Sequence, residues 1–124
     1  MNTQASAVAV FARVPRLSEL SAPRQALVRL CQSIDFGQIV GLQVHDGEPV
    51  FSPAPTIVLD VKLDAAPQGR PESELEDFAL RDEVCRLLAQ IDAMKEGRVD
   101  RIEVRAGIPR RIAIECRLTE APLW

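Results

Sequence analysis

The sequence predicts an α+β domain in which two α-β-β units place two helices on one face of a four-stranded, mainly antiparallel sheet. The main observation is that residues 37–49 and 97–109 follow one pattern, G-[QR]-[IV]-x-x-[LI]-[QE]-V-x-x-G-x-P. Each stretch comes after an amphipathic helical pattern and before an alternating apolar run. We therefore expect one helix–strand–turn–strand unit to be used twice, about a pseudo-two-fold axis.

Length and composition predict a single domain around one shared core. The chain has 124 residues, of which 47% are apolar and 27% charged, and its net charge is −3. That charge gives no global field toward nucleic acid or anionic lipid. The first residues lack a basic region, Arg13 and Arg16 interrupt the short apolar run, and no apolar stretch reaches the ~18 residues of a membrane span. We expect a cytoplasmic protein with reduced thiols.

We divide the chain into five parts. They are an N-terminal arm or edge strand (1–20), the first α-β-β unit (21–63), a linker (64–72), the second unit (73–118) and a tail (119–124). Residues 7–14 are apolar, with Val8, Val10, Ala12 and Val14 at alternate positions, which fits either a strand or an arm that packs on a partner.

The first unit begins with a helix over residues 22–35. Ser21 is the expected N-cap, an apolar stripe follows at helical spacing, and Gly37 ends the helix.

A strand over 38–45 should place Val40, Leu42 and Val44 on one face and Ile39, Gln43 and His45 on the other. Asp46-Gly47 predicts a tight turn, and 52–55 should break the pairing because proline lacks an N–H donor. A strand over 56–63 should then turn Ile57, Leu59, Val61 and Leu63 inward.

The second unit begins with a capping box formed by Ser73 and Glu76. Its helix is expected to run to Lys95, and its hairpin to pair residues 98–105 with 111–118. A register with Val104 opposite Ile112, Ile102 opposite Ile114 and Arg101 opposite Glu115 would match apolar residues and opposite charges.

The hairpin pattern resembles the YezD-like family of small bacterial proteins of unknown function. The matching residues are Gly37, Val44, Asp46 and Gly47 in the first copy, and Gly97, Val99, Val104 and Gly107 in the second. The resemblance implies a short helix, a glycine-led strand, a turn and a charged strand. Pro49 and Pro109 depart from the family's apolar strand, and no catalytic residue is implied.

Three groups of residues are candidate reactive centres. His45 lies beside Asp46, but no second histidine or nearby cysteine completes a zinc set, so a turn residue is favoured over a ligand. Cys31, Cys85 and Cys116 lie on or beside apolar stripes, which favours core packing over a nucleophile. Glu72, Glu74, Glu76 and Asp77 cluster at a helix start, where helix capping explains them. We therefore expect no catalytic residue, metal or cofactor.

Two surfaces remain as candidate binding sites. The outer face of the second hairpin should present Arg101, Arg105, Arg111 and Arg117, which suit phosphates or an acidic partner. That face lacks the aromatic residues that stack on bases, since the chain has no tyrosine and its phenylalanines lie elsewhere. The outer face of the first unit should present Ile39, Phe51 and Val58 as an apolar patch.

These surfaces support three hypotheses for function. The leading one is a non-catalytic, dimeric module for protein–protein interaction or regulation, which binds a protein through the apolar patch or a sheet edge. The expected partner is a second copy of the chain, as a homo-oligomer, or another protein. The alternative is weak nucleic-acid binding through the arginines. An enzyme that uses His45 or a cysteine ranks last.

Overall fold

The computed structural model describes residues 15–64 and 75–115. The elements in chain order are η1 (Leu17–Glu19), α2 (Ala22–Ile34), β1 (Gly37–His45), β2 (Glu48–Val50), β3 (Thr56–Leu59), α3 (Asp82–Met94), β4 (Gly97–Arg105) and β5 (Ile108–Ile114). The predicted strand or arm over 7–14 and the tail lie outside the described residues. No helix in the described part is both long and apolar enough to cross a membrane.

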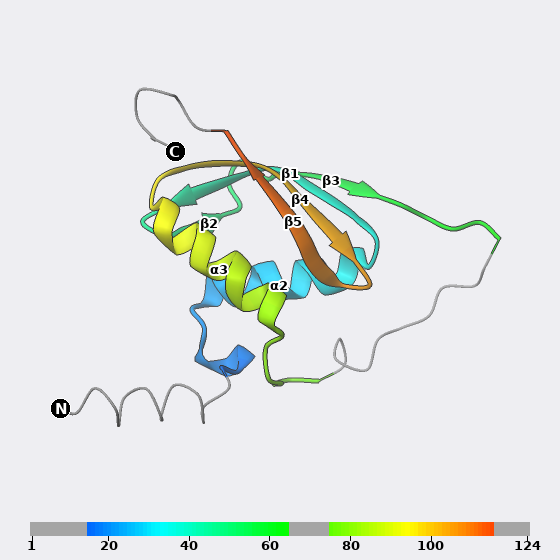
Figure 1. Ribbon diagram of the computed structural model, residues 1–124, viewed down its shortest axis with the longest axis horizontal. Helices are drawn as coiled ribbons and strands as arrows, with labels where there is room; N and C mark the ends of the chain where they lie inside the picture. Colours follow the sequence, from blue (N-terminus) through cyan, green and yellow to red (C-terminus); the bar gives the residue numbers. More distant parts are fainter. Residues whose placement is uncertain (1–14, 65–74, 116–124) are drawn as a thin grey trace.

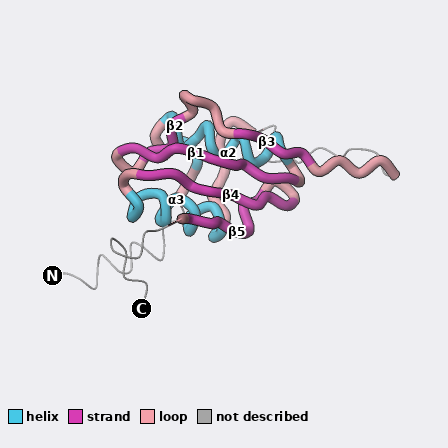
Figure 2. Tube along the Cα trace, turned by 90° about the horizontal axis from the view of Figure 1, so that it is seen from above, coloured by secondary structure: helices cyan, strands magenta, loops and turns pink. Residues whose placement is uncertain are grey.

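The strand pairings in the described part of the chain are antiparallel, and both helices cover one face of the sheet (Figures 1 and 2). Its strand order is β2-β1-β4-β5. The remaining strand, β3, pairs with residues 37–40 of β1, whereas β2 pairs with residues 43–45. The α+β class is therefore confirmed, but the expected number of four strands is wrong because the sheet has five. The extra strand is β2, which completes the hairpin before the proline-rich break at residues 51–55.

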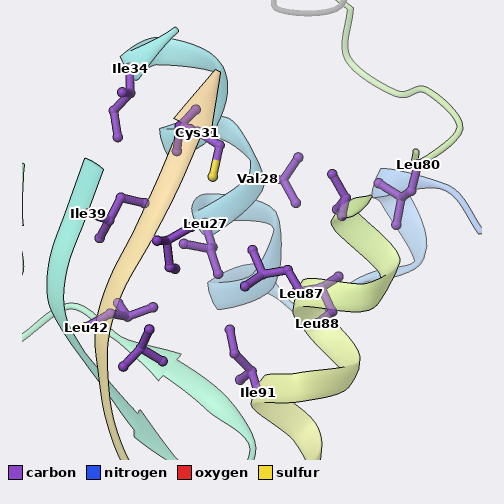
Figure 3. Close-up of a cluster of buried hydrophobic side chains, with 14 of the residues drawn as sticks. Leu27, Val28, Cys31, Ile34, Ile39, Leu42, Leu80, Leu87, Leu88 and Ile91 are labelled. Atoms are coloured by element: carbon purple, nitrogen blue, oxygen red, sulfur yellow. The ribbon is translucent and has the colours of Figure 1, made fainter. Parts of the chain in front are cut away.

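The core lies between the sheet and the two helices. Figure 3 shows Leu27 and Cys31 of α2 opposite Ile39 of β1, with Leu87 and Ile91 of α3 beside them. The side chains that are buried almost completely are Leu17, Leu27, Cys31, Ile39, Leu42, Ile91, Val99, Ile102 and Val104. Burial of each large side chain stabilises the fold by roughly 1.5–3 kcal/mol.

Residue faces in β1 differ from the sequence prediction. Ile39 and Leu42 are both buried, although strict alternation would put them on opposite faces. Gly41 adopts a φ of 80°, a conformation that glycine accepts readily, and the alternation changes phase there. The expected outward position of Ile39 is therefore wrong, and Val40 takes the outer face instead.

The register of the second hairpin also differs. Ile102 lies opposite Ile112, Val99 opposite Ile114 and Arg101 opposite Ala113, so the expected pairing of Arg101 with Glu115 is wrong. The turn closes at Ala106-Gly107, immediately after β4, and this tight closure shifts every later pair. The observed register differs from the predicted one by two residues at Ile102–Ile112 and by three at Val99–Ile114, because the ladder is irregular between Val99 and Arg101.

The second helix starts later than predicted, at Asp82. The N–H of Leu17 donates to the Phe78 carbonyl at 2.9 Å, and the N–H of Leu80 donates to the Pro15 carbonyl at 2.8 Å. This extended pairing of residues 15–17 with 78–80 satisfies backbone groups that a helix would otherwise use. Glu76 therefore does not start a helix, and Ser73 lies outside the described residues.

Both helices end in the same way. The Asp35 and Lys95 backbones adopt a φ of 65°, and their N–H groups donate to the carbonyls of Cys31 and Ile91. The left-handed residue is thus Asp35 and not the predicted Gly37, which instead begins β1. The start of α2 follows the prediction, since the Ser21 hydroxyl accepts a hydrogen bond from the Arg24 N–H.

Candidate interaction surface

Residues 56–63, here called the β3 segment, leave much of their apolar side-chain surface in solvent. All four residues of β3 are exposed. The exposed fraction is 58% for Leu59, 67% for Val61 and 94% for Leu63. Figure 2 shows that the chain leaves the body of the sheet at the end of β3. Apolar residues that are exposed together commonly mark a site of protein association.

The β3 segment is held to the sheet by the start of β1. Gly37 lies opposite Leu59, and a Cβ atom at Gly37 would come within 2.0 Å of the Val58 carbonyl oxygen. The Asp60 N–H donates to the Phe36 carbonyl at 2.8 Å. The missing side chain of Gly37 therefore allows this close approach of the two backbones.

One edge of β3 has no strand beside it in the described part of the chain. Hydrogen-bonded positions alternate along an antiparallel strand, and Asp60 bonds back toward β1. Ile57 and Leu59 therefore direct their backbone N–H and C=O groups away from β1. This edge can accept an additional strand.

The structure corrects the predicted burial of the β3 segment. Ile57 pairs with Ile39 and Leu59 with Gly37, so both lie on the helix side of the sheet as predicted. The strand nevertheless ends at Leu59, and these side chains are exposed rather than inward. Sequence alternation gave the correct face, but it could not indicate that the helices do not cover it.

A shallow hollow of about 480 Å³ lies beside the β3 segment. Phe36, Val58 and Leu59 supply its apolar wall, and Glu103 and Arg105 border it. Phe36 is 40% exposed, so an aromatic ring adds to the apolar surface. The predicted apolar patch did not include Phe36, Leu59, Val61 or Leu63. For the three residues of the β3 segment, the signal that could have found them is the alternation of apolar residues with Asp60 and Lys62 after two prolines, a pattern typical of edge strands.

The three residues of the predicted apolar patch do not lie together. Ile39 is fully buried in the core, and Phe51 is partly buried against it. Val58 is exposed and belongs to the β3 segment. The phase change at Gly41 explains why Ile39 is absent from the surface.

The predicted arginine face is present in part. Arg101, Arg105 and Arg111 are all exposed. Glu103 lies between the first two along β4, and its carboxylate is 4.0 Å from the Arg111 guanidinium. Acidic charge thus offsets the basic charge on this face. Arg117 lies outside the described residues.

His45 is joined to a carboxylate from the other half of the chain. Its Nδ1 lies 2.8 Å from Oε1 of Glu96, and the Asp46 N–H donates to Oε2 of Glu96 at 2.8 Å. The Asp46 N–H and then the His45 ring lower the pKa of Glu96. Both side chains are more than half exposed, and the arrangement ties a turn to a helix end without forming a cleft.

The cysteine thiols are unsuited to nucleophilic chemistry. Burial raises the pKa of Cys31 to about 12. Partial burial, and then the nearby charge of Asp82, raise the pKa of Cys85. A catalytic cysteine needs a lowered pKa, because the thiolate is the nucleophile. Cys116 lies outside the described residues.

Asp77 joins the segment before α3 to the segment before α2. The Arg16 guanidinium donates to it at 2.8 Å, and the Ser18 N–H donates at 2.9 Å. These hydrogen bonds lower the pKa of Asp77 to about 2. The predicted role in helix capping is wrong for this residue, because α3 starts after it. Glu72 and Glu74 lie outside the described residues.

A second hollow of about 350 Å³ lies between the start of α3 and the β4–β5 turn, bordered by Phe78, Val84 and Gly107. At the β1–β2 turn, the Arg24 Nη2 donates to the Gly47 carbonyl at 2.8 Å. Among the described residues, no three His, Cys, Asp or Glu side chains gather as a metal site would require.

Comparisons of the chain with protein-family models, curated proteins and solved structures give no match. The resemblance of each half to the YezD-like family therefore stays a prediction.

Proposed function

We propose that this protein is a non-catalytic interaction module that binds another protein chain through the β3 segment. The observation behind the proposal is an edge strand whose four residues are all exposed and whose outer backbone groups face away from β1. A strand added to such an edge gains main-chain hydrogen bonds, and the apolar side chains supply contact area. Two observations argue against a reactive centre in the described residues. The pKa values of the Cys31 and Cys85 thiols are raised, and the His45 side chain is exposed.

A duplicated unit is part of the proposal. Each element of the second half starts 60 residues after its counterpart, as the helices do at 22 and 82 and the strands at 37 and 97. The pairing of β1 with β4 has the same symmetry, since Gly37 lies opposite Val104 and Val44 lies opposite Gly97. These relations support a pseudo-two-fold axis between β1 and β4.

A reducing compartment such as the cytoplasm is also proposed, supported by the free thiols of Cys31 and Cys85.

A site-specific photocrosslinker tests the proposed function. We would place it at Val61 in the β3 segment and, as a control, at Ala113 on the opposite edge strand β5, where the side chain is also exposed. Irradiation of cells that make the protein should give a covalent adduct with a protein from position 61 and none from position 113. Absence of an adduct at position 61, or equal adducts at both positions, would overturn the proposal.

Nucleic-acid binding through Arg101, Arg105 and Arg111 is the second candidate. Its support is the exposure of three guanidinium groups on two paired strands. Glu103 and the net charge of −3 weigh against it. Such binding should weaken steeply as salt rises, because counterions are released when phosphates are neutralised. A filter-binding titration of RNA and DNA at two salt concentrations tests it, and absent or salt-insensitive binding removes it.

A further inference from the structure

We propose that the partner of the β3 segment is a second copy of this chain, paired antiparallel through residues 59–63 about a two-fold axis at Val61. The inference rests on the proposed function and specifies its partner. In this register Val61 faces Val61 of the second copy, and Leu59 faces Leu63 of the second copy.

Charge is the first argument for this register. Around Val61 the segment carries one acid, Asp60, and one base, Lys62. Antiparallel pairing about Val61 places Asp60 opposite Lys62 of the second copy and Lys62 opposite its Asp60. Parallel, in-register pairing would instead place like charges together. Opposite charges across two strands stabilise the pair, and like charges destabilise it.

The backbone gives an independent argument. The Asp60 N–H is directed toward the Phe36 carbonyl, so Ile57 and Leu59 direct their backbone groups outward. β3 ends at Leu59 and Leu63 lies in a bend, so the proposed pairing extends the strand to residue 63, and the odd-numbered residues are then the outward ones. A two-fold axis at Val61 makes Leu59, Val61 and Leu63 the hydrogen-bonded positions. The charged residues then fall at the non-hydrogen-bonded positions, where side chains approach more closely. The two arguments select the same register.

The apolar side chains and their position favour the same pairing. Residues directly opposite in an antiparallel pair share a face, so the leucines and valines of both copies would contact one another. Val61 and Leu63 are among the most exposed apolar side chains of the described chain. Figure 1 shows the segment after β3 running away from both helices.

The other sheet edge is less suited to self-pairing. The second residue of β5 is Pro109, which lacks an N–H donor, and Arg110 and Arg111 follow it. Adjacent like charges and proline are the usual protection of an edge strand. The contrast between the two edges explains why we assign the second copy to the β3 segment.

Charge reversal tests the register. Lys62→Asp makes residues 60 and 62 both acidic, and Asp60→Lys makes both basic, so each variant places like charges across the two-fold axis. We expect each to raise the dimer dissociation constant on the order of tenfold at low salt, because the axis creates two repulsive pairs. A mixture of the two variants should regain dimerisation, since acid then meets base. Sedimentation equilibrium measures all three, with Arg101→Asp as a control for the change in net charge caused by Lys62→Asp.

A second variant separates the backbone contribution. Val61→Pro removes an N–H that would bond to the second copy, while residue 61 lies outside the pairing of β3 with β1. It should dissociate the dimer and leave the circular dichroism of the monomer unchanged. A protein that stays monomeric at every concentration, or a dimer that tolerates both charge reversals and Val61→Pro, would overturn the inference.

The crosslinker at position 61 separates this inference from the proposed function. An adduct of twice the chain mass supports both. An adduct with a different protein supports the proposed function and overturns the second copy as partner. Absence of any adduct at position 61 overturns both.

Discussion

The backbone N–H of Gly107 donates a hydrogen bond to the carbonyl oxygen of Asp35 at 2.8 Å, which ties the β4–β5 turn to the end of α2. The reciprocal bond joins the Gly47 N–H to the Lys95 carbonyl at 2.9 Å. Each turn thus closes on the helix of the other half. Neither half satisfies these groups alone, so we expect the two halves to unfold together.

The turn at Ala106 leads to the first prediction. Ala106 adopts a φ of 56°, which costs a residue with a Cβ atom about 1–2 kcal/mol. Ala106→Gly should therefore raise the free energy of unfolding by about 1 kcal/mol, measured by urea denaturation. Ala113→Gly, in an exposed strand position, should lower it by about 0.5–1 kcal/mol. Equal losses in both variants would contradict the strain at Ala106.

Arg24 leads to the second prediction. Its guanidinium donates to the Gly47 carbonyl at 2.8 Å and to Asp92 at 3.3 Å, and its side chain is only 23% exposed. Arg24→Met keeps the apolar stem and removes these bonds, so the free energy of unfolding should fall by about 1–2 kcal/mol. Arg86→Met changes an exposed residue of α3 and should stay within about 0.5 kcal/mol of the wild type. Similar losses for the two variants would show that Arg24 holds no special position.

The third prediction concerns pH. Because the pKa of Asp77 falls from 3.8 to about 2 on folding, the folded state favours the ionised carboxylate. The stability gained from this preference is complete above the unfolded pKa and is lost as the pH falls through the folded pKa. The difference in unfolding free energy between wild type and Asp77→Asn should therefore be constant above about pH 5 and shrink between about pH 4 and pH 2.

Urea denaturation at several pH values measures this difference. Arg16→Met removes the donor that contributes most to the lowered pKa of Asp77. In the Arg16→Met background, the pH dependence caused by Asp77→Asn should become smaller. A difference that does not vary from pH 5 to pH 2 would contradict the assignment.

Gly37 leads to the fourth prediction. A Cβ atom there would lie 2.0 Å from the Val58 carbonyl oxygen, so β3 must move away from β1 in Gly37→Ala. We expect a loss of about 1–3 kcal/mol in unfolding free energy. Amide exchange at Asp60 should also become faster, because its bond to the Phe36 carbonyl depends on this approach. Amide exchange measured by NMR checks it, with Gln38→Ala as the neighbouring control, and unchanged protection at Asp60 would contradict the role of Gly37.

The sequence by itself determined the elements whose signals are local. The apolar stripe and the cap at Ser21 predicted α2 within one residue of its observed end, and Asp46-Gly47 predicted the first turn. Helical periodicity also placed Leu87 and Ile91 of α3 in the core. These signals suffice because periodicity, caps and turns depend on residues close together in the chain.

Only the tertiary structure decided the surface on which the proposed function rests. The alternation of the β3 segment is the same whether its apolar side chains are covered or exposed, and their exposure depends on how far the helices extend over the sheet. The burial of Ile39 likewise required the positive φ of Gly41, and the extended path at Phe78 required its pairing with Leu17. Each outcome is set by contacts between distant parts of the chain, which local periodicity does not encode.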